Sequence, residues 1–352
     1  MPGDAPIIAY INRIGTAVPA HDVHGLFVEW ALSRISDPRA ASLFRRMAER
    51  SGIDKRWSVL APPPGGSQID GGFYDGGMPP TSARMAVYAE EAPRLALDAI
   101  AKLGNLGEVS HIVVASCTGF VAPGIDQIIA RELGLAPGIE RTLVGFMGCY
   151  AAVAALRVAH HIVRSTPEAR VLVVMVEISS VHLQATTELE PLLAMLQFGD
   201  GAAAAIVSAA AEGVAIDRFF AHTLPDSAEL IGWTIGDEGF VMHLDGAVPH
   251  RIGEALHDPT ARRALIGEEP VDRWAVHAGG RSVLDAVERG LDLPPHALAD
   301  SRTVLAEKGN MSSATIMFVL ERIMADAPTA NGVAIAFGPG LAAEGFHFRS
   351  AT

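Results

Sequence analysis

Three residues that lie far apart in the sequence have the side chains that acyl-transfer chemistry needs. Cys149 precedes a long alanine-rich helical pattern. A thiol at a helix N-terminus faces unpaired N–H groups and the positive end of the helix dipole, which favours the nucleophilic thiolate. His277 follows a strand pattern and precedes the pair Gly279–Gly280, and Asn310 lies just before another helix. Together they could supply a nucleophile and two donors for a carbonyl oxygen.

Each of these residues also has a simpler explanation when it is taken alone. A cysteine of the Cys149 type is often a small buried side chain that fills space. A lone histidine is more often structural than catalytic, and Asn310 could be an ordinary helix N-cap. Their positions in an internal repeat favour the chemical interpretation.

The repeat aligns three segments of the first half with three of the second. HIVVASCTG (111–119) matches RWAVHAGG (273–280), GFMGCYAAVAALRVAHHIV (145–163) matches GNMSSATIMFVLERIM (309–324), and ARVLVVMVE (169–177) matches NGVAIAFGPG (331–340). The offsets are 277 − 117 = 160, 310 − 149 = 161 and 337 − 175 = 162. Near-constant offsets indicate two copies of one α/β unit. We expect residues 1–210 to carry Cys149 and residues 211–352 to carry His277 and Asn310, with one central cleft between them.

Short apolar runs alternate with longer helical patterns along the chain. The runs predict buried strands at Ile112–Ala115, Val171–Val176, Ala204–Val207, Trp274–Val276 and Val333–Phe337. The helical patterns lie at about Ser82–Lys102, Gly124–Leu133, Tyr150–Arg164, Ser282–Arg289 and Ser312–Met324. This alternation predicts an α/β fold with strands covered on both faces. The Gly- and Pro-rich segment Pro62–Pro80 is expected to form a surface loop.

Composition excludes several classes of protein. Of 352 residues, 49% are hydrophobic and 19% are charged, which argues against intrinsic disorder. The net charge of −13 is unsuited to binding nucleic acid phosphates. No apolar run approaches the roughly 20 residues of a membrane helix, and the first residues lack the features of a signal peptide. Two cysteines form no disulfide framework, so we expect a cytoplasmic, reducing location. The histidine pairs lack further ligands at metal-binding spacing, so no metal is expected.

Several motifs follow one another in an order that identifies a family. CTGFVAPGID (117–126), the Cys149 segment, FGDGAAAAIV (198–207), HAGG (277–280), GNMSSA (309–314) and AFGPG (336–340) resemble the type III polyketide synthases, the chalcone synthase-like family. The resemblance covers most of the chain, from about Arg46 to Phe337. It implies a thiolase-like fold, in which a duplicated unit forms five αβαβα layers, and a homodimer.

The resemblance also implies roles for the three residues. Cys149 would take a starter acyl group from a CoA thioester, and His277 and Asn310 would hold the thioester carbonyl of malonyl-CoA. An imidazolium at His277 would stabilise the Cys149 thiolate. Acyl-CoA and malonyl-CoA would be substrates, with no further cofactor, and the released product would be a cyclised pyrone or a phenolic, resorcinol-type compound.

The resemblance assigns further residues to the cavity and to CoA. Phe198 would be the gatekeeper between the CoA tunnel and the reaction cavity. Arg46 and Arg50 match positions that contact CoA phosphates, a contact suited to guanidinium groups, and Ser282 is assigned to CoA as well. Three cavity positions have unusual residues: Met242 stands where plant members have a second gatekeeper Phe, His182 stands where a smaller residue is usual, and Cys117 adds a second thiol. We therefore expect a remodelled cavity.

Two other functions are compatible with these residues. A ketoacyl-ACP synthase III-like enzyme uses the same Cys, His and Asn but condenses once with malonyl bound to a carrier protein. Alternatively, a non-catalytic interaction protein could have kept the fold. Product formation from malonyl-CoA without carrier protein would exclude the first alternative. Fast alkylation of Cys149 at neutral pH would exclude the second.

Overall fold

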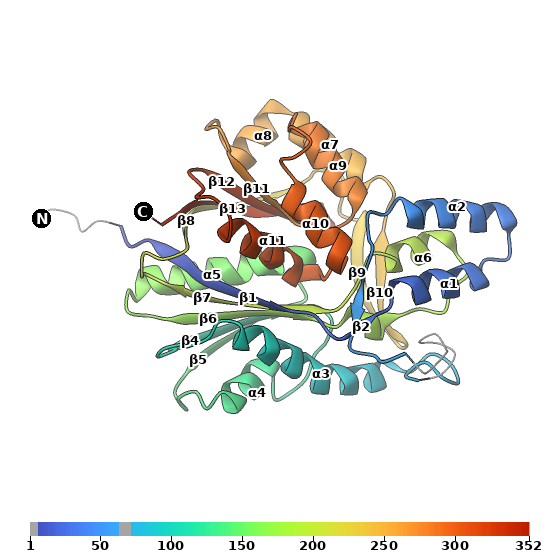
Figure 1. Cartoon of the computed structure of the whole chain (residues 1–352), viewed down its shortest axis with the longest axis horizontal. Coiled ribbons are helices and arrows are strands. Elements are labelled where there is room, and N and C mark those ends of the chain that lie inside the picture. Colours follow the sequence, from blue (N-terminus) through green and yellow to red (C-terminus); the bar gives the residue numbers. More distant parts are fainter. Residues whose placement is uncertain (1–5, 63–71, 352) are drawn as a thin grey trace, which may run out of the picture.

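The computed structural model describes residues 6–62 and 72–351, and layers of helices and strands alternate in it (Figure 1). One outer layer holds α3 (Thr81–Ala101) and α4 (Ile125–Glu132), and the other holds α7 (Val248–His257), α8 (Pro259–Ile266) and α9 (Arg281–Gly290). The central helices are α5 (Ala151–Ser165) and α11 (Thr315–Met324), with α10 (Ala299–Lys308) beside α9 and α11. A strand layer lies on each side of the central helices, which confirms the predicted αβαβα arrangement.

The two strand layers are joined at one edge. The described strands include nine that are hydrogen-bonded in the order β11-β12-β13-β8-β1-β7-β6-β4-β5. One layer contains β1 (Ala9–Ala17), β4 (His111–Ser116), β5 (Glu140–Gly145), β6 (Val171–Glu177) and β7 (Gly201–Ser208), and the other contains β8 (Val214–Thr223), β11 (Arg273–Val276), β12 (Gly332–Gly338) and β13 (Ala342–Ser350). They meet where β1 and β8 pair antiparallel.

The elements of the internal repeat occupy equivalent places in the two layers. β4 pairs parallel with β6, and β11 pairs parallel with β12. The helix that leads into β6 is α5, and the helix that leads into β12 is α11; both lie between the layers. Every residue of β6 and β12 is buried, as expected for strands covered on both faces. The boundary at residues 210 and 211 stays a prediction.

All five predicted strands and all five predicted helices are present, with shifted ends. The predicted helix from Ser312 begins at Thr315, because Ser312–Ala314 forms a 3₁₀ turn whose first residue has a positive φ of 48°. The sequence analysis missed β1, β8 and β13, in which buried and partly exposed residues mix. Residues 63–71 of the expected Pro62–Pro80 loop lie outside the described residues, and residues 72–80 form neither helix nor strand.

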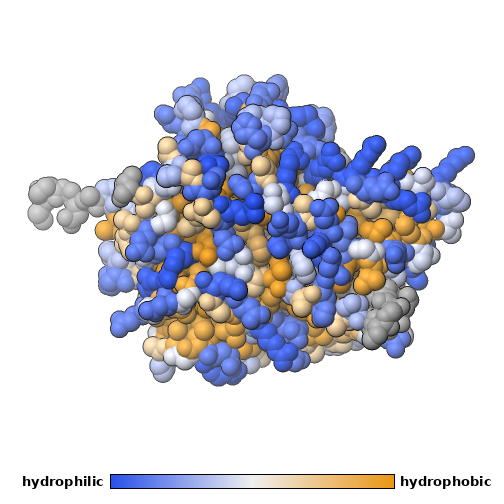
Figure 2. All heavy atoms as spheres, viewed as in Figure 1, coloured by the Kyte–Doolittle hydropathy of each residue, from blue (hydrophilic) through white to orange (hydrophobic). Residues whose placement is uncertain are grey.

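A smaller group of elements stands beside the layers. Helices α1 (His24–Arg34), α2 (Pro38–Glu49) and α6 (Leu189–Met195) share an apolar core, next to the hairpin of β9 (Ile231–Gly236) and β10 (Gly239–Leu244) (Figure 1). The strands β2 (His21–Asp22) and β3 (Trp57–Ser58) connect this group to the layers. On the face seen in Figure 2, apolar side chains gather over the layer of α3 and α4. No described helix is long and apolar enough to cross a membrane.

Candidate active site

Cys149 lies in a 3₁₀ turn (Gly148–Tyr150) that leads directly into α5, as the sequence predicts. Gly148 has a positive φ of 72°, and a side chain there would collide with the ring of Pro339. Only glycine therefore allows the chain to turn so tightly before the cysteine. The turn buries Cys149 to 9% exposure between the central helix and the end of β12.

His277 follows the last residue of β11, and its backbone N–H donates to the Ile335 carbonyl at 2.8 Å. The side chain is 1% exposed, and neither ring nitrogen has a hydrogen-bond partner among the described residues. Burial lowers the pKa of His277 to about 3, so the imidazole is neutral at physiological pH. A buried neutral ring with two unmatched nitrogens is costly unless a ligand completes its hydrogen bonds.

Asn310 lies between α10 and the 3₁₀ turn at Ser312, and its side-chain amide is fixed in one orientation. Its Oδ1 accepts a hydrogen bond from the Ser312 backbone N–H at 2.8 Å, and its Nδ2 donates to the Gly279 carbonyl at 3.2 Å. Its backbone carbonyl accepts from Gly199 N–H at 2.9 Å, beside Phe198. The second hydrogen of Nδ2 is the one that can reach the Cys149 sulfur or a ligand oxygen.

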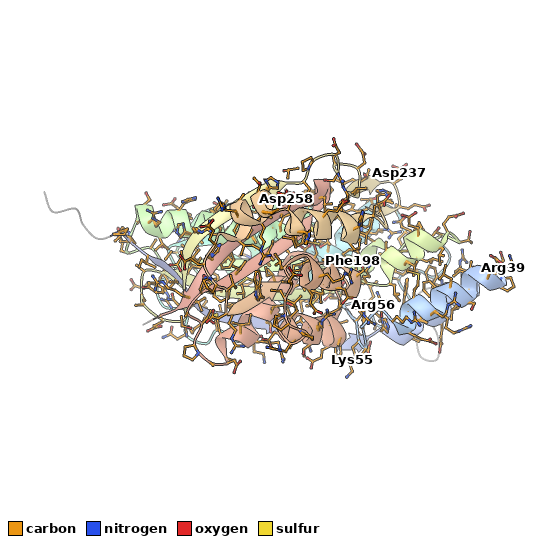
Figure 3. All side chains as sticks on the ribbon, turned by 90° about the horizontal axis from the view of Figure 1, so that it is seen from above. Arg39, Lys55, Arg56, Phe198, Asp237 and Asp258 are labelled. Carbon is orange, nitrogen blue, oxygen red and sulfur yellow. The ribbon has the colours of Figure 1, made fainter. Side chains whose placement is uncertain are left out.

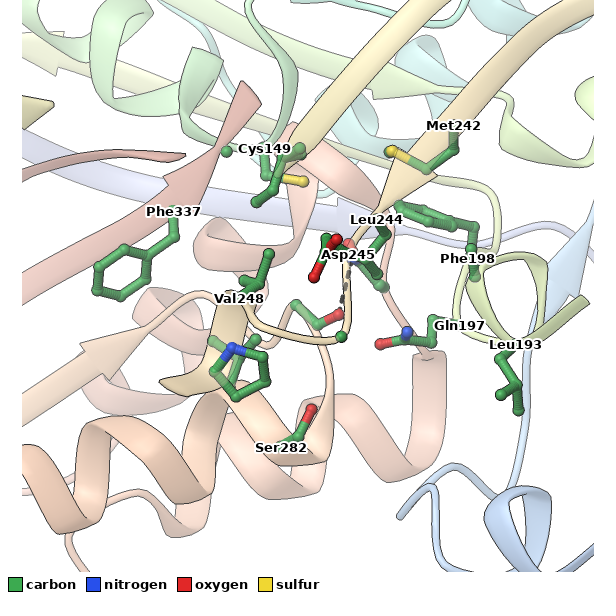
Figure 4. A pocket seen from close by; sticks show the side chains of 18 of the residues that line it. Cys149, Leu193, Gln197, Phe198, Met242, Leu244, Asp245, Val248, Ser282 and Phe337 are labelled. Carbon is green, nitrogen blue, oxygen red and sulfur yellow. Dashed lines mark hydrogen bonds between the residues drawn. The ribbon is translucent and has the colours of Figure 1, made fainter. Parts of the chain in front are cut away.

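One cavity of about 470 Å³ brings these groups together. Cys149, His277, Asn310, Phe198 and Met242 all line it, and Figure 4 shows Cys149, Met242 and Phe198 facing it. The rest of its wall is largely apolar and includes Ile231, Leu244, Val248, Ile252 and Phe337. Phe198 is partly buried and lies close to Arg56, whose guanidinium donates to the Phe198 carbonyl at 2.6 Å (Figure 3).

Burial also decides the protonation of the nucleophile. It raises the pKa of Cys149 to about 12, and the charge of Glu177 acts in the same direction. Hydrogen bonds from Ser312 and Asn310 lower that pKa, but by less than burial raises it. Burial thus acts against the expected pair of thiolate and imidazolium, because it raises the pKa of the thiol and lowers the pKa of the imidazole.

The second thiol lies behind the first. Cys117 does not line the 470 Å³ cavity; it borders a space of about 20 Å³ together with Cys149, Phe198 and Met242. Its side chain is buried, and its Sγ lies 3.1 Å from the Ser312 hydroxyl. Burial raises the pKa of Cys117 well above its usual range, so this thiol is also protonated.

His182 lies apart from the 470 Å³ cavity, in the wall of a neighbouring cavity of about 280 Å³ that Phe198 and Met242 also line. Its Nε2 is 2.7 Å from the Thr118 carbonyl, and its Nδ1 accepts from the Phe240 N–H at 3.0 Å. The ring stacks on Phe240 with centroids 4.2 Å apart. Burial lowers the pKa of His182 to about 4, and no ring nitrogen is free for a substrate.

Trp233 is a cavity residue that the sequence analysis missed. It borders both the 20 Å³ space and the 280 Å³ cavity, and its Nε1 donates to the Cys117 carbonyl at 2.8 Å. Its ring meets His182 and Phe240 edge to face. The sequence could have pointed to this residue, because Trp233 is a tryptophan within the glycine-flanked strand β9. None of the family motifs contained it, however.

The entrance carries positive charge. A hollow of about 420 Å³ is lined by Arg50, Arg281, Ser282 and Asp285, whose carboxylate lies 3.6 Å from the Arg281 guanidinium. The hollow shares Ser282 and Gln197 with the main cavity. Arg46 is exposed on α2 and does not line this hollow. Arg281 was missed, although it directly follows HAGG; its guanidinium donates to the Arg50 carbonyl at 3.1 Å.

Comparisons with known proteins agree with this geometry. The family model described as chalcone and stilbene synthases, N-terminal domain, matches residues 3–211, and the C-terminal domain model matches residues 216–352. The chain is 31% identical to the alpha-pyrone synthesis polyketide synthase-like Pks18 of Mycobacterium tuberculosis, over 99% of this chain and 92% of the relative. It is 32% identical to bisdemethoxycurcumin synthase of Oryza sativa subsp. japonica, over 95% of this chain and 90% of the relative.

A solved structure is similar over the whole length. PKS-I from the brown alga Ectocarpus siliculosus superposes with a TM-score of 0.88 at 28% identity, covering 99% of this chain and 100% of that one. The chain belongs to the chalcone and stilbene synthase family, and it is a type III polyketide synthase, an acyltransferase.

Proposed function

We propose that Cys149 takes an acyl group from acyl-CoA, that malonyl-CoA extends this group by decarboxylative condensation, and that His277 and Asn310 bind the thioester carbonyl. This proposal is carried by His277, whose two ring nitrogens have no hydrogen-bond partner in the described part of the chain and which lines the same cavity as a thiol and a fixed amide. Since the relative Pks18 is named for alpha-pyrone synthesis, we propose a pyrone product, with a resorcinol-type phenolic as the other candidate.

The proposed chemistry has two halves. In loading, the Cys149 sulfur attacks the acyl-CoA carbonyl and gives up its proton, the C–S bond to CoA breaks, and the CoA sulfur takes up a proton and leaves as a thiol. In extension, malonyl-CoA loses carbon dioxide, and the electron pair of the broken C–C bond becomes an enolate. The enolate oxygen accepts one N–H from neutral His277 and one from Asn310. Its carbon then attacks the acyl-Cys149 carbonyl, the C–S bond to Cys149 breaks, and the sulfur leaves as a thiolate.

Cavity size supports a short polyketide chain. The space behind Cys149 measures about 20 Å³, because Trp233 and its aromatic neighbours fill the interior. Replacing Trp233 with alanine would join this space to the 280 Å³ cavity. We expect Trp233→Ala to shift products toward longer chains, and mass spectrometry of the product mixture measures it. Ile235→Ala, an exposed position on the same strand, is the control. An unchanged product distribution would contradict this role of Trp233.

The entrance suits the phosphates of CoA. Arg50 and Arg281 line the hollow that continues into the main cavity, and exposed guanidinium groups bind phosphates through charge-assisted hydrogen bonds. We expect Arg281→Ala to raise the KM for malonyl-CoA by about tenfold with little change in kcat. The reason is that Arg281 would bind the CoA part equally well in the substrate complex and in the transition state. Steady-state kinetics at two salt concentrations measures this change in KM. The matched control is Arg39→Ala, which removes an arginine far out on α2 (Figure 3). An equal rise in KM for that variant would show that the overall charge of the protein, and not the Arg281 contact, is responsible.

An exposed apolar face supports a homodimer. Phe120 and Leu143 are 48% and 52% exposed, and most of the edge strand β5 is open to solvent. Open edges and apolar patches of this kind are usually covered by a partner.

The proposed chemistry also favours a location for the protein. A nucleophilic thiol has to stay reduced, which supports the cytoplasm as its location.

The proposed function is tested by supplying malonyl-CoA with a panel of short, long-chain and aromatic acyl-CoAs and analysing the products by mass spectrometry. The proposal expects polyketide products in the absence of any carrier protein. If products appear only when malonyl is attached to a carrier protein, a ketoacyl synthase III-like reaction is the better description. If no product forms with malonyl-CoA or with a malonyl-loaded carrier protein, and Cys149 acquires no acyl group, the protein is non-catalytic.

A further inference from the structure

The segment 195–200 is hydrogen-bonded to the backbone of Asn310 in two places. The Asn310 backbone N–H donates to the Gln197 carbonyl at 2.8 Å, and the Asn310 carbonyl accepts from the Gly199 N–H at 2.9 Å. Phe198 lies between these two contacts in the same segment. Because Asn310 is attached in this way, a group that fixes the segment also fixes the place of Asn310 in the cavity wall.

Arg56 binds this segment but does not line the 470 Å³ cavity. Its Nη1 donates to the Phe198 carbonyl at 2.6 Å and to the Met195 carbonyl at 3.0 Å, so one nitrogen joins two carbonyls of the segment. Burial lowers the pKa of Arg56 to about 10, and the guanidinium is therefore charged at pH 7. Arg56 is 3% exposed, and hydrogen bonds from a charged donor are strong where water is excluded.

The guanidinium of Arg56 is itself held in one orientation. Its Nε donates to the His24 Nδ1 at 3.1 Å, and its carbon lies 4.6 Å from the centre of the Phe27 ring. Burial, together with the charge of Arg56, lowers the pKa of His24 to about 4, so the imidazole is neutral and its Nδ1 can accept. The backbone is paired as well, because the Arg56 N–H donates to the Asp22 carboxylate at 3.2 Å and the Arg56 carbonyl accepts from Val23 at 2.8 Å.

The aliphatic part of Arg56 also packs against Gly309, the residue directly before Asn310. Gly309 has a φ of 70°, and a Cβ atom there would lie 2.8 Å from the Arg56 Cγ and 3.0 Å from the Gln197 carbonyl oxygen. Only glycine therefore allows this close approach. Arg56 thus contacts both partners of the junction, the segment 195–200 through its Nη1 and the backbone before Asn310 through its methylene groups.

We propose that Arg56 is a positioning residue, which fixes the segment 195–200 and thereby holds the Asn310 amide where the thioester oxygen binds. This inference rests on the proposed function of Asn310. The Asn310 side chain donates to the Gly279 carbonyl and accepts from the Ser312 N–H, so its direction depends on where its own backbone lies between these two groups. A displacement of about 1 Å at a reacting group can cost about 10²-fold in rate.

The end of the segment at Asp200 has an attachment that does not involve the Arg56 side chain. The Asp200 N–H donates to the Trp57 carbonyl at 2.8 Å, and its carboxylate accepts from the Val59 N–H at 2.9 Å. Loss of the Arg56 guanidinium should therefore leave the segment attached at Asp200 and release it at Met195 and Phe198. We expect a shift of Asn310 in a folded protein, which kinetics can detect.

The test is a double-mutant cycle in which release of carbon dioxide measures the decarboxylation of malonyl-CoA. Arg56→Met keeps an unbranched side chain without donors, and Asn310→Asp removes the amide donor. We expect Arg56→Met to lower kcat about tenfold in the wild type, with the KM for malonyl-CoA changed less than about twofold. In the Asn310→Asp background no amide donor is left to position, so the same replacement should lower kcat less than about twofold. Arg56→Lys, which keeps a charged donor, should recover part of the loss.

Arg84→Met is the matched control for the loss of a buried arginine. Arg84 is fully buried and donates to the carbonyls of Val181 and Leu183 at 2.6 and 2.9 Å, outside the segment 195–200. We expect this variant to decarboxylate malonyl-CoA within about threefold of the wild-type rate. Thermal unfolding shows which variants are folded, and Arg56→Lys takes the place of Arg56→Met in the cycle if the methionine variant does not fold.

Three results would overturn the inference and leave the proposed function standing. These are an equal loss from the Arg56 replacement in both backgrounds, a wild-type rate in the Arg56 variant, and an equal loss in Arg84→Met. Each would show that Arg56 does not act through the Asn310 amide. If Asn310→Asp decarboxylates malonyl-CoA as fast as the wild type, the proposed function of Asn310 fails, and the inference fails with it.

Discussion

Replacing Cys149 with alanine is expected to abolish acyl-enzyme formation and to lower product formation by roughly 10⁴-fold or more, because no other group at the site can carry the acyl chain covalently. Cys149 begins the central helix and lines the cavity, whereas Cys117 lies behind it in a space of about 20 Å³. The mass of the intact protein after mixing with acyl-CoA measures the adduct directly.

The matched control for this variant is Cys117→Thr, which removes the neighbouring thiol and keeps the nucleophile. It should still acquire one acyl group. We expect Cys149→Ala to change the free energy of unfolding by about 1 kcal/mol or less, because a small buried side chain is replaced by a slightly smaller one. An acyl adduct on the Cys149→Ala protein would contradict the assignment of the nucleophile.

Replacing His277 with glutamine is expected to slow malonyl-CoA decarboxylation by about 10²–10³-fold while CoA binding changes only a few-fold. In the proposed function the imidazole donates to the oxygen on which charge develops, and loss of one such donor costs this much in comparable enzymes. The Arg50 and Arg281 entrance is unchanged by the variant. Release of carbon dioxide, followed with and without a loaded starter, separates decarboxylation from condensation.

The pH dependence provides an independent check on His277. Because burial lowers its pKa to about 3, the imidazole stays neutral from about pH 5 upward. Decarboxylation by the wild type should therefore show no inflection near pH 6.5, the usual pKa of histidine. Such an inflection, lost in His277→Gln, would show that the imidazolium is the active form and would contradict the neutral donor. Asn310→Asp, which removes the other donor, should give a loss of similar size.

The sequence was informative where local patterns decide structure. The alanine-rich run after Cys149 and the fully apolar runs of β6 and β12 predicted the central helix and two buried strands, because the periodicity of such segments reflects their burial directly. The repeat predicted that Cys149, His277 and Asn310 would meet, and all three line one cavity. Family motifs pointed to Phe198, which lines that cavity too.

What the sequence did not predict depends on tertiary packing. The protonation of Cys149 and His277 follows from how completely they are buried, and the pattern of residues around a helix start does not contain that information. His182 was assigned to the substrate cavity, but its ring is stacked on Phe240 beside a neighbouring cavity. The contact between Cys117 and Ser312 joins two segments that are 195 residues apart in the chain.

The central claim is that Cys149 carries the acyl chain within reach of His277 and Asn310. The most direct measurement is peptide mapping by mass spectrometry after the wild-type protein is mixed with an acyl-CoA and quenched in acid. The account predicts one acyl group, attached to the peptide that contains Cys149, with the Cys117 peptide unmodified. An acyl group found on Cys117, or a protein that releases CoA without acquiring any acyl group, would contradict it.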